Sequence, residues 1–277
     1  MRAPFTLRFA KLALPVVLGA SMLSTIGLAR AADVKTVEAG KLTYGVAATF
    51  APFEFTKDGT LTGFDIDIVN AISAKMKLAA NAQSMQFSGL IPALQGGRID
   101  MINSAMYITP ARSAQVDFVP YLKVGDRIIV QAANPAKITG RDDSVCGKNI
   151  AVTLGGIEET YARADVTRCQ AANKPAPNVM TLPTAQDAAL SLRQGRADAI
   201  YNSTPGTVKL LDDVPGVYAA VGAEFEQKTN IGFAVPKGNA AFADALRAAL
   251  TQVVADGTYD KLIAKWKLPE TVSIFKQ

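Results

Sequence analysis

The chain has 277 residues and contains no histidine, which excludes Ser-His-Asp and Cys-His catalytic groups and the HExxH metal motif. Residues 1–31 hold four of its 29 basic residues and none of its 24 acidic ones, so the remainder has 25 basic against 24 acidic residues. A balance this close to neutral gives no basis for nucleic-acid binding. We therefore expect no nucleic-acid partner, no metal ion and no cofactor.

Residues 1–31 predict a secretory signal peptide. Arg2, Arg8 and Lys11 precede an apolar run over 12–28, and Ala29-Arg30-Ala31 has the A-x-A form of a cleavage site. A membrane anchor is the alternative, but the run is short for a span and no second apolar segment follows. We expect a periplasmic protein whose signal peptide is cleaved.

The two cysteines, Cys146 and Cys169, form an even pair. In an exported protein such a pair is most simply a disulfide, and two buried free thiols are the alternative.

From residue 41 onward, strand-like and helix-like patterns follow one another, which predicts an α/β fold. Strands are expected over 41–47, 78–85, 100–104, 116–118, 127–131, 149–153, 179–182, 197–201 and 230–235. Helices are expected over 64–76, 89–94, 184–194, 239–255 and 259–266, and from residues 110, 157 and 204. Pro52 predicts a loop over 49–53, and Lys57-Asp58-Gly59-Thr60 a turn.

Helix caps are predicted at three places, namely Ser88, Thr109 before Pro110, and the segment Ser203-Thr204-Pro205. One motif also occurs twice. Gly97-Arg98-Ile99-Asp100 and Gly195-Arg196-Ala197-Asp198 each end a helix and begin a strand, and a Thr-Pro helix start follows each. Chance reuse of common loop residues is the alternative to two similarly built lobes.

Ligands of open α/β sheets bind beyond the carboxyl ends of the strands, near helix N-termini. Arg112 lies one turn into such a helix and could hold a carboxylate, or could be a solvated surface arginine. Gly155 and Gly156 could admit an anion to backbone N–H groups, or form a plain turn. Phe50 and Phe87 follow strand ends and could flank a ligand or belong to the core.

At these residues the chain closely resembles the periplasmic polar-amino-acid-binding proteins of ABC importers, the extracellular solute-binding proteins of family 3. The resemblance covers essentially the whole mature chain. It is carried by Gly45-Val46, 49–55 (TFAPFEF), 63–67 (GFDID), 90–94 (LIPAL), 97–100 (GRID), 108–112 (ITPAR) and 116–118 (VDF).

The resemblance implies a two-lobed periplasmic-binding-protein fold of type II, with two hinge strands and the ligand in the interlobe cleft. Lobe 1 would hold residues 32–124 and 231–277, and lobe 2 residues 125–230. The Cys146–Cys169 pair matches a disulfide found in a subset of the family. The implied function is capture of a small solute, by hinge closure, for a cognate ABC permease in the inner membrane. We expect a monomer that is not an enzyme.

The resemblance also implies roles at individual positions. Arg112 matches the arginine that binds the ligand's α-carboxylate, Phe50 and Phe87 match the aromatic residues around its side chain, and Ala105 matches a position that hydrogen-bonds through its backbone.

Three positions depart from the family pattern. Tyr107 stands where a Ser or Thr is usual, Gly156 where a Thr is common, and Ser203 where an Asp pairs with the α-ammonium. A buried ammonium without that acid would cost several kcal/mol. Glu54, Asn202 and Tyr201 are the candidates to compensate.

The expected ligand is therefore a small carboxylate-containing amino acid or derivative, with or without a free α-ammonium. Tyr107 and Tyr201 with Phe50 and Phe87 could instead surround a cation. The alternative function is a cyclohexadienyl or arogenate dehydratase on the same fold, with Glu54 as its acid or base. A ligand-sensing ectodomain is disfavoured, because no transmembrane segment follows Gln277.

Overall fold

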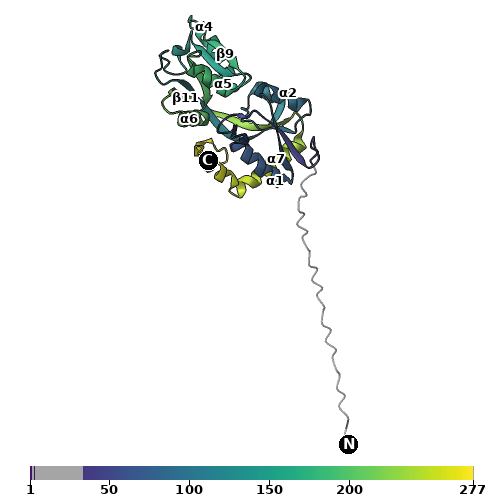
Figure 1. Cartoon of the computed structure of the whole chain (residues 1–277). Coiled ribbons are helices and arrows are strands. Elements are labelled where there is room, and N and C mark those ends of the chain that lie inside the picture. Colours follow the sequence, from purple (N-terminus) through teal and green to yellow (C-terminus); the bar gives the residue numbers. More distant parts are fainter. Residues whose placement is uncertain (2, 4–33, 277) are drawn as a thin grey trace. The chain divides into compact units, whose positions relative to one another are not determined.

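The computed structural model describes residue 1, residue 3 and residues 34–276. Apart from residues 1 and 3, the predicted signal peptide lies outside the described residues. The described residues 34–276 belong to one compact unit (Figure 1). None of the helices in the described part is long and apolar enough to cross a membrane.

An eight-stranded mixed sheet organises the fold, with the strand order β5-β1-β6-β11-β7-β10-β8-β9. In chain order its strands are β1 (Lys41–Val46), β5 (Ala79–Ser84), β6 (Met101–Ile102), β7 (Val116–Gln131), β8 (Asn149–Thr153), β9 (Asn178–Leu182), β10 (Ala199–Ser203) and β11 (Tyr218–Pro236). The long strands β7 and β11 pair antiparallel in the middle. Strands β5, β1 and β6 lie on one side of this pair, here called the first half, and β10, β8 and β9 lie on the other, here called the second half.

Helices cover both faces of each half. They are α1 (Phe64–Met76), α2 (Leu90–Gln95), α3 (Pro110–Ser113), α4 (Ile157–Ala171), α5 (Ala185–Arg193), α6 (Thr204–Asp213), α7 (Ala240–Ala255) and α8 (Thr258–Lys265). In the first half, α1 and α7 lie against each other (Figure 1) and share a buried apolar cluster with β1, whereas α2 packs with β6 in a separate cluster. In the second half, α4 and α5 contribute to different clusters. Each half is therefore a sheet with helices on both faces.

Local sequence explains where most helices begin. The side chains of Thr109, Thr184, Ser203 and Asn239 each accept a hydrogen bond from a backbone N–H in the first turn of α3, α5, α6 and α7 respectively. Ser88 was predicted to cap a helix in the same way, and this prediction is wrong. A 3₁₀ turn over Phe87–Gly89 precedes α2, whose N-cap is Gly89 without a side-chain bond.

Two strands that were predicted separately are the two ends of a single long strand. The strands expected over 116–118 and 127–131 are both parts of β7, and β11 begins at Tyr218, well before the predicted start at residue 230. Pro120 and Gly125 interrupt the local pattern, but pairing between β7 and β11 continues through register shifts. Conversely, the strand expected over 100–104 is reduced to Met101–Ile102. Long-range pairing, which a local pattern does not report, decides these lengths.

A second, three-stranded sheet was missed in the predicted loop. Thr49–Phe50 (β2) pairs with Glu54–Lys57 (β3), which pairs with Thr60–Thr62 (β4). The predicted turn at 57–60 is confirmed as the two-residue hairpin between β3 and β4, where Asp58 and Gly59 both have positive φ. This sheet presents Phe50 and Glu54 to the site described below.

The repeated Gly-Arg-x-Asp motif has the same structural role in both halves. Asp100 accepts a hydrogen bond from the N–H of Thr43 (2.7 Å) and donates its own N–H to the carbonyl of Thr43 (2.7 Å). Asp198 makes the equivalent pair with Asn149, at 2.8 Å in each case. Each aspartate thus joins the start of its own strand to the neighbouring parallel strand. This shared construction fits the prediction of two similarly built lobes, while the boundaries at 124/125 and 230/231, which fall within β7 and β11, stay a prediction.

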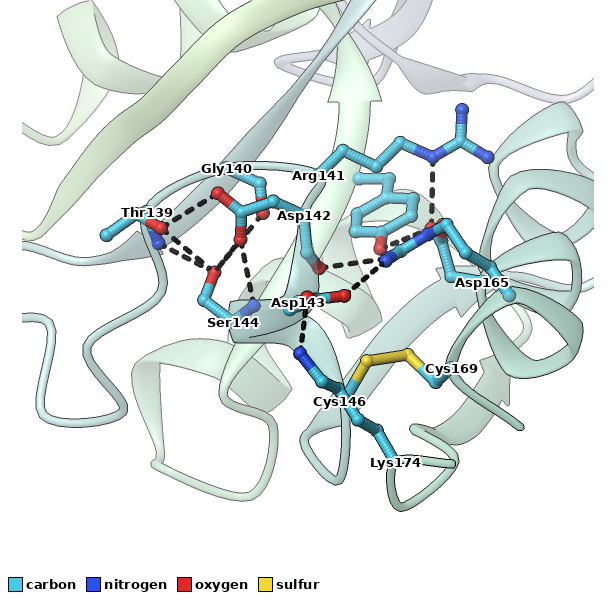
Figure 2. Close-up of polar contacts among 12 residues, drawn as sticks. Thr139, Gly140, Arg141, Asp142, Asp143, Ser144, Cys146, Asp165, Cys169 and Lys174 are labelled. Carbon is cyan, nitrogen blue, oxygen red and sulfur yellow. Dashed lines mark hydrogen bonds and ion pairs between the residues drawn. A yellow bond between two sulfur atoms is a disulfide. The ribbon is translucent and has the colours of Figure 1, made fainter. Parts of the chain in front are cut away.

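The predicted disulfide is present between Cys146 and Cys169, whose Cα atoms are 5.7 Å apart. Figure 2 shows it beside a set of ion pairs that hold the segment before β8 against α4. Arg141 Nε lies 3.0 Å from Asp165 Oδ2, and Asp143 pairs with Lys174. The disulfide and these charges together attach the 139–146 segment to the second half.

Removing the disulfide should lower the free energy of unfolding by about 3 kcal/mol, because it closes a loop of 22 residues in the unfolded chain. The change is Cys146→Ser with Cys169→Ser, and urea unfolding at neutral pH measures the result. Reduced wild-type protein is the matched control and should behave like the double variant. An unchanged unfolding midpoint in both would contradict a stabilising disulfide.

Candidate ligand-binding site

Two adjoining pockets open beyond the carboxyl ends of β1 and β8. The smaller has a volume of about 30 Å³ and the larger about 210 Å³. Both are lined by Thr49, Phe50, Thr153, Glu158 and Ala185, so they form one continuous cleft. Residues of both halves contribute to it.

The smaller pocket collects most of the predicted first-half residues. Those of its lining residues that were predicted from the sequence are Phe50, Glu54, Phe87, Ala105, Tyr107 and Gly156. The larger pocket includes Tyr201 and Asn202. Ser203 belongs to neither lining. The structure therefore brings six of the predicted residues around one pocket and separates three others from it.

Arg112 lies beside the smaller pocket and is 9 % exposed. Thr109 caps α3 by accepting from the backbone N–H of Arg112, and Nη1 of Arg112 donates to the carbonyl of Tyr107 (2.7 Å). Nη2 donates to the carbonyl of Gly155 (2.9 Å), which belongs to the second half. The guanidinium also lies over the ring of Phe87, 5.4 Å from its centroid. Arg112 is thus a buried cation, not a solvated surface residue.

Burial lowers the pKa of Arg112, while the nearby carboxyl of Glu158 opposes this effect. Among the described residues Arg112 makes no ion pair. A guanidinium has five N–H donors, and two neutral carbonyls do not neutralise its charge. The arrangement is suited to an incoming anion.

Tyr107 is buried, and its hydroxyl lies 3.4 Å from Oδ1 of Asp126 on β7. Asp126 is fully buried, and its Oδ2 has no hydrogen-bond partner in the described chain. Burial, followed by the charge of Glu158, raises the pKa of Asp126 well above its usual range. Tyr107 therefore points its hydroxyl toward a buried acid that the sequence did not single out.

Glu54 and Asp65 form a second buried acidic pair, under the smaller pocket. Glu54 accepts from the hydroxyl of Ser104 (2.8 Å), and Asp65 accepts from the hydroxyl of Tyr121 (2.7 Å). One oxygen of each carboxyl group has no partner among the described residues. Burial raises the pKa of Asp65 to about 7 and that of Glu54 well above its usual range. The two groups are best described as sharing a proton.

Asp65 also determines what Ala105 can offer a ligand. Oδ2 of Asp65 accepts the N–H of Ala105 at 2.7 Å, and Ala105 has a positive φ of 38°. Because its only donor is used inside the protein, the predicted backbone hydrogen bond of Ala105 has to come from its carbonyl oxygen.

The predicted second-half residues are largely committed to structure. The side chain of Ser203 accepts from the N–H of Gly206 (3.1 Å) as the N-cap of α6, and the residue is fully buried. The hydroxyl of Tyr201 donates to Asp165 (2.9 Å). The four aromatic side chains suggested as a cage do not surround one space, since Tyr107 lines the smaller pocket and Tyr201 the larger.

Glu158, the second residue of α4, is the site residue that sequence reasoning missed. It lines both pockets and is 6 % exposed. The sequence shows two adjacent acids in the first turn of this helix, where acids are common. The neighbour, Glu159, instead accepts from the N–H of Gly155 and pairs with Arg163. The sequence contains no signal that distinguishes the two.

Comparison with known proteins agrees with this fold. The model of the bacterial extracellular solute-binding proteins, family 3, matches residues 42–269. The L-arginine-binding protein of Pseudomonas aeruginosa is 33% identical over 259 residues, which cover 90% of this chain and 94% of the relative.

Two solved structures are similar throughout. An ancestral arginine-binding protein bound to arginine has a TM-score of 0.76 and 34% identity, covering 82% of this chain and 98% of that one. An ancestral amino acid-binding protein, described as a precursor of cyclohexadienyl dehydratase, has a TM-score of 0.72 and 31% identity, with coverage of 82% and 95%.

The fold and cleft define a two-lobed α/β ligand-binding protein, as the sequence predicted. The chain belongs to the bacterial extracellular solute-binding proteins, family 3.

The buried acids make stability depend on pH. In the folded protein Asp65 and Glu158 keep their protons to about pH 7, against ordinary pKa values of 3.8 and 4.5. Between these values the folded state binds more protons than the unfolded state, so the free energy of unfolding should fall as pH rises from 5 to 8. Each acid contributes up to about 3 kcal/mol.

Urea unfolding of the ligand-free protein at pH 5, 6, 7 and 8 measures this dependence. Asp65→Asn keeps an oxygen to accept from Tyr121 and Ala105 but does not titrate, so its dependence should be shallower. Stability that stays constant or rises over this range would show that these carboxyl groups ionise normally.

Proposed function

We propose that this protein captures a small amino acid or amino-acid derivative by its carboxylate and delivers it to an ABC permease in the inner membrane. The observation that carries the proposal is the buried guanidinium of Arg112, which has no ion-pair partner among the described residues and lies beside the cleft. Family membership supports a role outside the cytoplasm. The signal-peptide pattern of residues 1–31 supports a periplasmic location, and we expect a monomer.

Arg112 can link ligand arrival to a change in the cleft. Its Nη2 hydrogen bond to the carbonyl of Gly155 joins the first half to the second. A ligand carboxylate is a stronger acceptor than a carbonyl and fits a guanidinium bidentately. When the carboxylate accepts these hydrogen bonds from Arg112, the guanidinium no longer binds Gly155. Gly155 and the start of α4 would then contact the ligand instead of Arg112's side chain. Bending of β7 and β11, the two strands common to both halves, would accommodate this rearrangement.

Aromatic side chains would hold the rest of the ligand. Phe50 and Phe87 both line the smaller pocket, and Phe50 extends into the larger. The smaller pocket, of about 30 Å³, is much the narrower of the two. A ligand of several non-hydrogen atoms therefore needs the space toward the larger pocket, or a wider opening of the cleft.

The proposal concerns the carboxylate and leaves the amine to other groups. Ser203 caps α6 and offers no negative charge to an ammonium. The relatives named above for arginine show that the family accepts cationic amino acids, but they do not identify this protein's ligand. The ligand at this stage is an amino acid or derivative with a free carboxylate.

The dehydratase alternative rests on Glu54. It lines the smaller pocket, has one unpartnered oxygen and has a raised pKa, as a general acid requires. Similarity to a precursor of cyclohexadienyl dehydratase keeps this class in view. Incubation with prephenate or arogenate should give no product if the protein only binds. Product formation that Glu54→Gln abolishes would establish the enzyme instead.

Arg112→Ala should weaken binding by about 3–5 kcal/mol, because it leaves the ligand carboxylate buried without its partner. A thermal-shift screen of amino acids, opines, betaines and cyclic derivatives first identifies a ligand. Calorimetry with that ligand then compares the variants. Arg98→Ala, which removes an exposed arginine of the same half, is the matched control and should bind normally. Near-native affinity of Arg112→Ala would refute the carboxylate role.

A further inference from the structure

Glu158 is the acid best placed to meet a ligand in the cleft. The residue is 6 % exposed, and it lines both the smaller and the larger pocket, at the place where the two join. Among the described residues its carboxylate makes no ion pair and no hydrogen bond to another side chain. Ionising an acid that is buried to this extent costs free energy unless a cationic partner is present.

Gly156 makes room for this acid. A Cβ atom built on Gly156 would lie 2.6 Å from Oε2 of Glu158 and 3.1 Å from the carbonyl of Thr153. A larger side chain at 156 would therefore require the carboxylate to move. The glycine and the glutamate are sterically coupled, since the carboxylate occupies space next to the backbone that a side chain at 156 would fill.

Glu158 and Arg112 lie around the same two glycines with opposite charges. Arg112 donates to the carbonyl of Gly155, and Oε2 of Glu158 lies against Gly156. The charge of each side chain shifts the pKa of the other, but the two form no ion pair. The result is a cation and an anion held close together and separately available, which is complementary to a zwitterion.

We infer that Glu158 binds the α-ammonium group of the ligand, in place of the acid that is absent at position 203. This inference rests on the proposed function and specifies its ligand: an amino acid with a free carboxylate on Arg112 and a free α-ammonium on Glu158. Nα-acylated amino acids are excluded, because their amide nitrogen carries no charge for Glu158. The departures at Gly156 and Ser203 then have one explanation: the acid that is missing at the N-cap of α6 is replaced by an acid in the first turn of α4.

The electrostatic setting agrees with this role. Burial raises the pKa of Glu158 to about 7, and the residue's own backbone N–H, followed by Arg112, only partly opposes the shift. The other titratable groups that influence it are Asp126, Tyr107 and Tyr161. None of these is a cation, so an incoming ammonium is the group that would stabilise the ionised carboxylate.

The test compares free and Nα-acetylated forms of the same amino acids. The twenty L-amino acids and their Nα-acetyl derivatives are screened by thermal shift, and calorimetry is done with the free amino acid that stabilises most. Wild-type protein should bind this amino acid at least tenfold more tightly than its acetyl derivative. Glu158→Gln should lose at least tenfold in affinity for the free form and lose the discrimination between the two forms.

Three controls make the outcome specific. Glu159→Gln, the same charge change at the next residue, should bind within threefold of wild type. Circular dichroism melting should show Glu158→Gln folded and at least as stable as wild type, since a buried acid with a raised pKa is removed. Ser203→Asp added to Glu158→Gln should restore binding of the free amino acid, because Asp also caps helices and supplies the acid at its usual position.

A loss of less than tenfold in Glu158→Gln, or equal binding of free and acetylated forms by wild type, overturns the inference and leaves the proposed function standing. Normal binding by Arg112→Ala, or no stabilisation of wild type by any amino acid, overturns the proposed function itself.

Discussion

The antiparallel pairing of β7 with β11 is the constraint on which the rest of the structure depends. These two strands, of 16 and 19 residues, lie in the middle of the sheet and take part in both of its halves. Their pairing changes register between Val221 and Phe225 and again between Phe225 and Thr229. Fewer ladder hydrogen bonds hold the two strands together there. Movement of one half relative to the other would therefore break the fewest hydrogen bonds at this place. A binding cleft that opens and closes needs such a connection.

Most of the buried ionisable side chains of the described residues lie in or near the cleft. Arg112, Glu158, Asp126 and the Glu54–Asp65 pair are all buried within or next to it. Hydrogen bonds from Tyr121, Ser104 and Ala105 hold the acidic pair, and α3 with its Thr109 cap holds Arg112. Buried charges without partners are costly, and a ligand that supplies the partner recovers that cost as binding energy. The site is therefore organised for a polar ligand with defined positions of charge.

The acids in the cleft have different roles because their neighbours differ. Glu54 and Asp65 share a proton, and Oδ2 of Asp65 accepts the N–H of Ala105, so this pair supports the backbone there. Among the described side chains, the carboxyl group of Asp126 accepts a hydrogen bond only from the hydroxyl of Tyr107. Glu158 lines both pockets and lies beside Gly156, while Arg112 donates to the carbonyl of the adjacent Gly155. Position relative to solvent and to a cation, and not residue type, distinguishes a structural acid from a ligand-binding one.

The sequence by itself determined the local features and the family. Thr109, Thr184 and Asn239 cap the helices that they were expected to begin or precede, the Asp58-Gly59 turn forms its hairpin, and the two cysteines pair. These features depend on neighbours within a few residues, or on a motif as specific as the one ending at Arg112, and a sequence displays both directly. Only the tertiary structure decided the rest. It joined two predicted strands into β7, kept Ser203 out of both pocket linings, and buried Glu158 while leaving its neighbour Glu159 paired with Arg163. Those outcomes depend on which distant segments come into contact, and adjacent residues of one type differ only in the direction in which the folded helix points them.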